Sequence, residues 1–85
     1  MSGRVHVLLF AGAREAVGAG RLDLAVPAEG TPLAELMSSL VQRFPRLGRV
    51  APSSLVFLNG EVALGRRGRA RAGDEVAIHP PYSGG

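Results

Sequence analysis

The chain has 85 residues, of which 46% are hydrophobic and 20% are charged, and its formal net charge is +3 at pH 7. This length and composition predict one globular domain. Cysteine and lysine are both absent, which excludes disulfides, thiolate nucleophiles, thiolate metal sites and phosphate-binding loops of the Walker type.

The sequence predicts a cytoplasmic protein without a membrane segment. No apolar run approaches the roughly 20 residues that a membrane span needs. Residues 5–13 resemble the apolar part of a signal peptide, but His6 interrupts them and only Arg4 precedes them as a basic residue. With two histidines far apart in the chain, no metal site is expected.

Residues 4–10 alternate as a strand does. One face carries Val5, Val7 and Leu9. The other face carries His6, Leu8 and Phe10. The apolar residues on the second face indicate either a strand buried on both sides or a surface that meets a partner.

A helical turn is expected at residues 13–17, followed by a turn at Gly18-Ala19-Gly20. This glycine pair lacks the third glycine and the following helix of a dinucleotide site. Residues 21–26 alternate again and form a second strand, which we expect to pair with the first as a hairpin.

The clearest predicted element is a helix that begins after Thr31. Threonine is a good N-cap, proline at position 32 suits the first helical position, and Pro45 ends the helix. Its apolar residues follow the spacing of one buried stripe. They are Leu33, Leu36, Met37, Leu40, Val41 and Phe44.

The second half of the chain predicts three further strands. Residues 55–58 form one, Asn59-Gly60 is a type I′ turn signal, and residues 61–64 return as a short strand. Residues 65–73 are a polar, arginine-rich loop, and residues 75–79 form the last strand before two prolines. The order of elements predicts an α+β fold of the β-grasp (ubiquitin-like) type, a mixed sheet wrapped around one main helix. This order is strand, strand, helix, strand, short strand, strand. We place this domain at residues 1–79.

Residues 80–85 predict an extended tail. Pro80 and Pro81 favour a stiff start, and Tyr82, Ser83, Gly84 and Gly85 complete it. Two glycines without side chains can enter a channel too narrow for any Cβ. If Gly85 is the end of the chain, an activating enzyme can join its carboxylate to AMP, and sulfide or a persulfide can then replace AMP to leave a thiocarboxylate. Without cysteine, the terminal carboxyl is the expected position for activated sulfur.

Several segments resemble the small subunit of molybdopterin synthase (MoaD type), in the MoaD/ThiS family of ubiquitin-like sulfur carriers. They are Val7-Leu8-Leu9-Phe10-Ala11, Arg14-Glu15, Asn59-Gly60-Glu61, Gly73-Asp74-Glu75-Val76-Ala77, Pro80-Pro81 and Gly84-Gly85. The resemblance implies a sulfur carrier in molybdenum cofactor biosynthesis. In that family an adenylating enzyme uses ATP and magnesium to activate the residue matching Gly85, and a sulfurtransferase supplies sulfur.

The resemblance also implies the partner and the surface that meets it. The thiocarboxylate tail inserts into the large synthase subunit, which binds the precursor pterin, and the complex is a heterotetramer. The carrier is then a non-catalytic, sulfur-donating subunit that binds no cofactor itself. The family's partner-facing apolar surface maps to Phe10, Val62 and His79, with histidine where an aromatic residue is common.

Other functions stay open at this point. A related carrier could serve thiazole, cysteine or tRNA thiolation, and a ubiquitin-like modifier would use the same activated carboxyl. From a different class, the arginines of residues 66–71 could bind RNA, but no aromatic residue is interleaved with them for stacking. A solvated loop is the simplest interpretation of this basic run, and docking to an acidic partner is the next. A hydrolytic triad of Asp74, His79 and Ser83 is disfavoured because an extended tail offers no fixed pocket.

Overall fold

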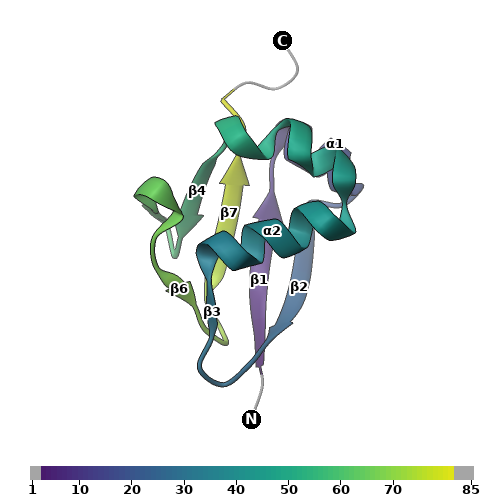
Figure 1. The fold of residues 1–85 in the computed structure, drawn as a ribbon. Helices are drawn as coiled ribbons and strands as arrows, with labels where there is room; N and C mark the ends of the chain where they lie inside the picture. Colours follow the sequence, from purple (N-terminus) through teal and green to yellow (C-terminus); the bar gives the residue numbers. More distant parts are fainter. Residues whose placement is uncertain (1–2, 82–85) are drawn as a thin grey trace.

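A computed structural model describes residues 3–81 of the chain. Its main sheet has the strand order β2-β1-β7-β4-β5 (Figure 1). These strands are β1 (Gly3–Leu9), β2 (Arg21–Val26), β4 (Leu55–Leu58), β5 (Glu61–Val62) and β7 (Glu75–His79). The central pair β1 and β7 is parallel, and every other neighbouring pair is antiparallel. The mixed sheet confirms the predicted α+β, β-grasp class.

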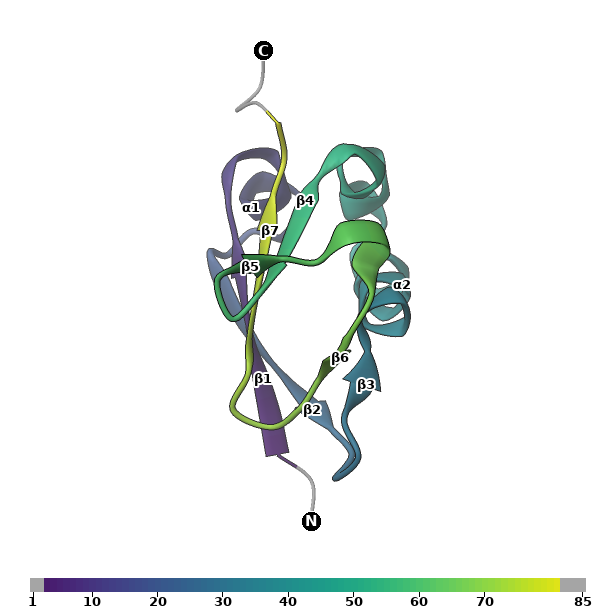
Figure 2. The same ribbon diagram turned by 90° about the vertical axis from the view of Figure 1, so that its left-hand side faces the viewer.

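Helix α2 (Leu33–Arg43) covers one face of this sheet, so that sheet and helix form two layers (Figure 2). Its buried residues belong to the predicted apolar stripe. They are Leu33, Leu36, Met37 and Leu40. From the sheet, Val5, Val7, Val76 and Ile78 are fully buried against this layer. The period of 3.6 in the helix and the period of 2 in the strands therefore meet in one core.

The predicted start of this helix was wrong. Thr31 is not the N-cap: Thr31–Pro32 form a short strand, β3, that pairs with β6 (Arg69–Ala70). Pro32 occupies the N-cap position without a side-chain cap, and the Leu33 amide donates instead to the carbonyl of Gly68 at 3.0 Å. A backbone acceptor from a distant segment thus replaces the local threonine side chain that the sequence indicated.

The predicted loop at residues 65–73 also contains regular structure. A 3₁₀ turn, η3 (Leu64–Arg66), follows β5, so the strand expected to reach Leu64 ends at Val62. The chain then passes into β6 and returns to β7. After α2, two further 3₁₀ segments, η1 (Pro45–Arg49) and η2 (Ala51–Ser53), lead into β4.

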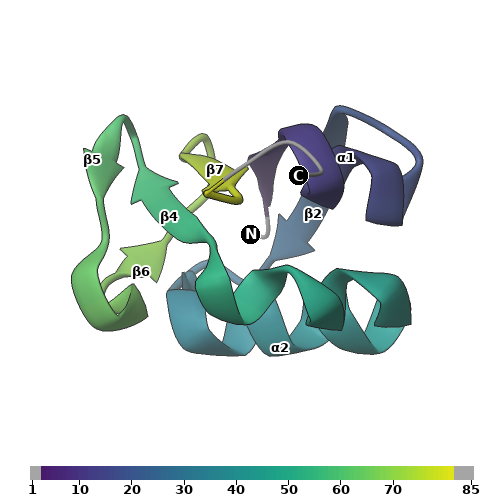
Figure 3. The same ribbon diagram turned by 90° about the horizontal axis from the view of Figure 1, so that it is seen from above.

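Helix α1 (Ala11–Val17) follows β1 directly and is two residues longer at its start than predicted. It ends at Gly18, whose φ of 86° is the left-handed conformation that glycine adopts without strain. Because β1 and β7 are parallel, their carboxyl ends lie at the same end of the sheet. Figure 3 looks down on that end, with α2 running along one side of the sheet. Within residues 3–81, no helix is both long and apolar enough to cross a lipid bilayer.

Candidate functional site

An apolar surface lies on the face of the main sheet that α2 leaves open. Phe10 is 40% exposed, Val62 44% and Leu55 53%, although all three are large hydrophobic residues. Single exposed apolar residues are common on proteins, but several on one sheet face indicate a surface that binds a partner. Phe10 and Val62 had been predicted for this role, and Leu55 had not.

Strand register explains how the surface forms. Leu55 pairs with His79, and Phe57 pairs with both Ala77 and Val62. Since alternate strand residues point to the same side, the residues between them, such as Val56 and Ile78, enter the core. We call the exposed side the outer face. Its residues at this end of the sheet are Leu8, Phe10, Leu55, Phe57, Val62, Ala77 and His79.

The imidazole of His79 packs against two phenylalanine rings. It stacks on Phe10, with ring centroids 4.0 Å apart and ring planes 13° from parallel. Phe57 meets it edge to face, with centroids 5.2 Å apart and an angle of 78°. Edge-to-face and parallel-stacked rings are both favourable aromatic arrangements. His79 therefore serves as an aromatic ring in this packing, at the position where the resemblance led us to expect one.

The backbone of Phe10 is held at both of its hydrogen-bonding groups. Its amide donates to the Ile78 carbonyl at 3.2 Å. Its carbonyl accepts from the amides of Ala13 and Arg14 at 3.0 and 3.3 Å. These bonds tie the end of β1 to β7 and to the start of α1, so the position of the Phe10 ring is set by three elements.

The predicted tail starts at this end of the outer face. β7 ends at His79, and Pro80 and Pro81 follow, which cannot donate to a sheet ladder. Pro80 is half-buried and Pro81 is exposed. Tyr82, Ser83, Gly84 and Gly85 lie outside the described residues. The structure thus brings the base of the tail, Phe10 and His79 together, and Val62 lies on the same face.

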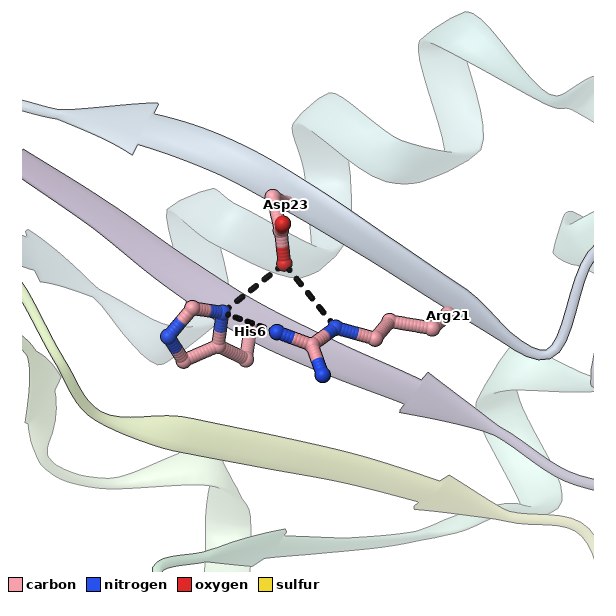
Figure 4. Close-up of polar contacts among 3 residues, drawn as sticks. All are labelled: His6, Arg21 and Asp23. Atoms are coloured by element: carbon pink, nitrogen blue, oxygen red, sulfur yellow. Dashed lines mark hydrogen bonds and ion pairs between the residues drawn. The ribbon is translucent and has the colours of Figure 1, made fainter.

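A polar cluster lies farther along the outer face, on β1 and β2 (Figure 4). His6 Nδ1 is 2.8 Å from Asp23 Oδ1 and 2.9 Å from Arg21 Nη2, and Arg21 Nε donates to Asp23 Oδ1 at 3.2 Å. A protonated Nδ1 donates to Asp23, whereas an unprotonated Nδ1 accepts from Arg21, so the tautomer selects one of these two bonds. Sequence reasoning missed the cluster, although the expected hairpin pairing of residues 4–10 and 21–26 could have found it.

The cluster changes the acidity of Asp23. The hydrogen bond from His6, followed by the hydrogen bond and the charge of Arg21, lowers the pKa of the Asp23 carboxyl below its usual value. Partial desolvation acts in the opposite direction and is outweighed. Asp23 therefore stays ionised at neutral pH and balances the charge of Arg21 beside the apolar part of the face.

The arginine-rich segment is not one solvated loop. Arg69 Nη1 donates to the carbonyls of Gly30 and Glu29 at 3.2 and 3.4 Å, and Arg66 Nη2 donates to the carbonyl of Ala51. Both side chains thus bridge segments that are far apart in the sequence. The interpretation as a solvated run is wrong for Arg66 and Arg69, which are half-buried, whereas Arg67 and Arg71 are exposed.

Asp74 and His79, two members of the disfavoured triad, lie apart, and Ser83 lies outside the described residues. Asp74 precedes β7 and His79 ends it, so they lie at opposite ends of the strand. The Asp74 carboxylate accepts from the Arg71 amide at 2.8 Å and from the Asn59 side chain at 3.2 Å. Among residues 3–81, no three histidine or acidic side chains lie close enough to hold a metal ion.

Comparisons with known proteins assign the family. The model of the ThiS family matches residues 7–85. The chain belongs to this family. The molybdopterin synthase sulfur carrier subunit of Arabidopsis thaliana is 38% identical over 81 residues, which cover 95% of this chain and 82% of that protein. The protein of the same name from Dictyostelium discoideum is 29% identical over 86 residues and is covered completely, as is this chain.

Solved structures of similar proteins share the fold. The crystal structure of SAMP1 from Haloferax volcanii matches with a TM-score of 0.80 at 31% identity, over 98% of this chain and 100% of that one. A complex of subunits 1 and 2 of the molybdopterin-converting factor from Helicobacter pylori matches with a TM-score of 0.63 at 22% identity, over the full length of both chains. The second likeness is one of fold alone.

Proposed function

We propose that this chain is the sulfur carrier subunit of a molybdopterin synthase and that the carboxyl group of Gly85 carries the sulfur. Membership of the ThiS family and the names of the curated relatives support the carrier function. The observation that carries the proposal is structural. The apolar outer face, with its stack of Phe10 on His79, lies where β7 gives way to Pro80 and Pro81.

The chemistry takes place at the terminal carboxylate. An activating enzyme transfers AMP from ATP to Gly85 with release of pyrophosphate, and magnesium accompanies the nucleotide. The resulting acyl adenylate has a good leaving group, so a sulfide nucleophile displaces AMP and leaves a thiocarboxylate. A sulfurtransferase supplies the sulfur for this step. This chain contributes the carboxyl group and presents it, while the catalytic groups belong to its partners.

The outer face binds the large subunit of the synthase. The Helicobacter pylori protein of the same fold was solved in complex with its subunit 2, which supports a partner of this kind. Phe10, Val62 and His79 contribute apolar and aromatic surface that gains free energy when a partner removes it from water. Docking here directs residues 80–85 towards the partner, where Tyr82, Ser83 and Gly84 lead the thiocarboxylate to the precursor pterin. In this assembly two carriers flank two large subunits as a heterotetramer.

Intact-mass measurement tests the loading step. The chain is incubated with ATP, magnesium, the activating enzyme and a sulfide donor. We expect a gain equal to the difference between sulfur and oxygen. Oxidation of one of the two methionines adds nearly the same mass, so the gain is assigned to the carboxyl only where it depends on ATP. A variant without Gly85 is the control, and sulfur loading of this variant at the wild-type rate would contradict the proposal.

A second candidate function is attachment to other proteins. The similarity to SAMP1, named small archaeal modifier protein 1 in its Methanosarcina acetivorans form at 28% identity and a TM-score of 0.79, favours it. The same acyl adenylate would react with a lysine amine of a target instead of sulfide. Since this chain has no lysine, its own side chains offer no acceptor for branched chains. Mass spectrometry of trypsin-digested targets tests this function, because the last arginine of the chain is Arg71 and a modified lysine would carry residues 72–85.

A further inference from the structure

A groove of about 330 Å³ lies at the edge of the main sheet, between the start of β4 and the segment that leaves β5. Its lining residues include Leu55, Val62, Leu64 and Arg66. These residues come from β4, β5 and the η3 turn, which Figure 2 shows beside one another at this edge. The groove is therefore mainly apolar with one cationic side chain.

Leu64 is the most exposed large hydrophobic residue of the described chain, at 73%. It precedes two residues with positive φ, Gly65 at 65° and Arg66 at 54°. A left-handed conformation costs a residue with a side chain about 1–2 kcal/mol, and such conformations are often found at functional sites. The turn thus holds Leu64 at the surface, next to one strained residue, Arg66.

Arg66 gives the groove its charge. Its guanidinium group is half-buried and donates one N–H to the carbonyl of Ala51. A guanidinium has five N–H donors and keeps its charge at all physiological pH values. Within residues 3–81, every ion pair involves Asp23, so no carboxylate of the described chain neutralises Arg66. A carboxylate from another molecule would neutralise the charge of Arg66 and accept hydrogen bonds from its guanidinium group.

The groove is continuous with the outer face. Leu55 pairs with His79, which belongs to the ring stack, and Val62 pairs with Phe57. Leu55 and Val62 therefore belong to both surfaces. A partner that covers the outer face reaches the groove without a break in the contact.

We propose that the groove binds a segment of the large synthase subunit that carries an apolar side chain next to a carboxylate. This inference rests on the proposed function. The apolar side chain inserts between Leu55, Val62 and Leu64, and the carboxylate accepts hydrogen bonds from Arg66. Two anchors of different chemistry also set the register of the docked subunits, since neither can move along the groove without losing the other.

Titration calorimetry of the full-length chain with the large subunit tests this proposal. Leu64→Ser should weaken binding about tenfold or more, because a leucine side chain would no longer be buried. Arg66→Gln should also weaken binding, more strongly at low than at high salt, because it removes a charge pair. Arg67→Gln is the matched control. It removes the same charge from the next residue, which is exposed and caps the same turn, and it should leave the dissociation constant within about twofold of the wild-type value.

The outcomes separate this inference from the proposed function. If the wild-type chain does not bind the large subunit at all, the proposed function itself fails. If Phe10→Ser weakens binding while Leu64→Ser and Arg66→Gln do not, the outer face docks and the groove proposal is overturned. If Leu64→Ser and Arg66→Gln reduce adenylation but keep their affinity for the large subunit, the groove binds the activating enzyme. If they keep that affinity but abolish a dimer of the free chain, the groove binds a second copy. Either result also overturns the proposal. Leu64→Ser is at an exposed site, so its unfolding temperature should match that of the wild type.

Discussion

The imidazole of His79 lies flat against the ring of Phe10, with centroids 4.0 Å apart, at the point where the last strand ends. His79 ends β7, Phe10 directly follows β1, the strand parallel to β7, and both residues remain partly open to solvent. The pair lies on the outer face of the sheet, directly before the predicted tail. Pro80, the first residue of that tail, follows His79 in the chain.

Removing either ring should weaken docking. We expect Phe10→Ser and His79→Ala each to raise the dissociation constant for the large subunit about tenfold, because aromatic area is no longer buried. His79→Phe should stay close to the wild-type value, since it keeps a ring in the stack. Arg4→Gln, at the far end of β1, is the control. Equal affinity of His79→Ala and His79→Phe would show that the ring does not contribute.

The Asp23 cluster should make stability depend on pH. Because the pKa of the Asp23 carboxyl is lower in the folded state, ionisation stabilises the fold above the unfolded pKa of about 3.9. This contribution is lost as the pH falls through the lower folded-state pKa. Thermal unfolding of the wild type and Asp23→Asn should therefore differ at pH 7, and the difference should shrink as the pH falls from about 4 through the folded-state pKa. A difference that is as large at pH 3 as at pH 7 would contradict this assignment.

Substitutions of core residues should lower the free energy of unfolding much more than substitutions on the outer face. Leu33→Ala removes a fully buried side chain and should cost about 2–5 kcal/mol in the free energy of unfolding. Leu55→Ala, on the outer face at 53% exposure, should change it by less than about 1 kcal/mol. Urea unfolding checks both values. A loss of stability in Leu55→Ala as large as that in Leu33→Ala would show that the outer face is part of the core.

Gly30 should tolerate no side chain. Its φ is 80°, and a Cβ would lie 2.7 Å from the Ala70 carbonyl oxygen, in the strand that pairs with β3. Gly73 has a similar φ of 89° but open space around it, so it is the matched control. We expect Gly73→Ala to cost about 1 kcal/mol from the backbone conformation alone. Gly30→Ala should cost clearly more, and equal unfolding free energies of the two variants would refute the steric explanation.

Local patterns predicted most of the regular structure. The ranges 21–26, 55–58 and 75–79 agree with β2, β4 and β7, and both residues of the Asn59-Gly60 turn have positive φ, as a type I′ turn requires. The predictions failed where a distant segment decides the conformation. Thr31 was predicted as an N-cap from its residue type alone. Its actual conformation depends on pairing with residues 69–70, which carry no strand signal of their own.

The candidate site was predicted in part. Phe10, Val62 and His79 came from the family resemblance, and the structure places them on one face. The contribution of Leu55 depends on strand register, and the burial of Arg66 depends on the carbonyl of Ala51. Neither relationship is local in sequence, so residue spacing alone could not reveal them.

Transfer of sulfur from the loaded carrier tests the central claim most directly. The thiocarboxylated chain is mixed with the large subunit and the precursor pterin, and the masses of carrier and pterin are followed in one turnover. We predict that the carrier returns to its carboxylate mass while the pterin gains sulfur, and that Phe10→Ser slows both changes equally at limiting large subunit. Two results would contradict the proposed function. One is a carrier that keeps its sulfur in the presence of the large subunit and the pterin, and the other is a pterin that gains sulfur without the carrier.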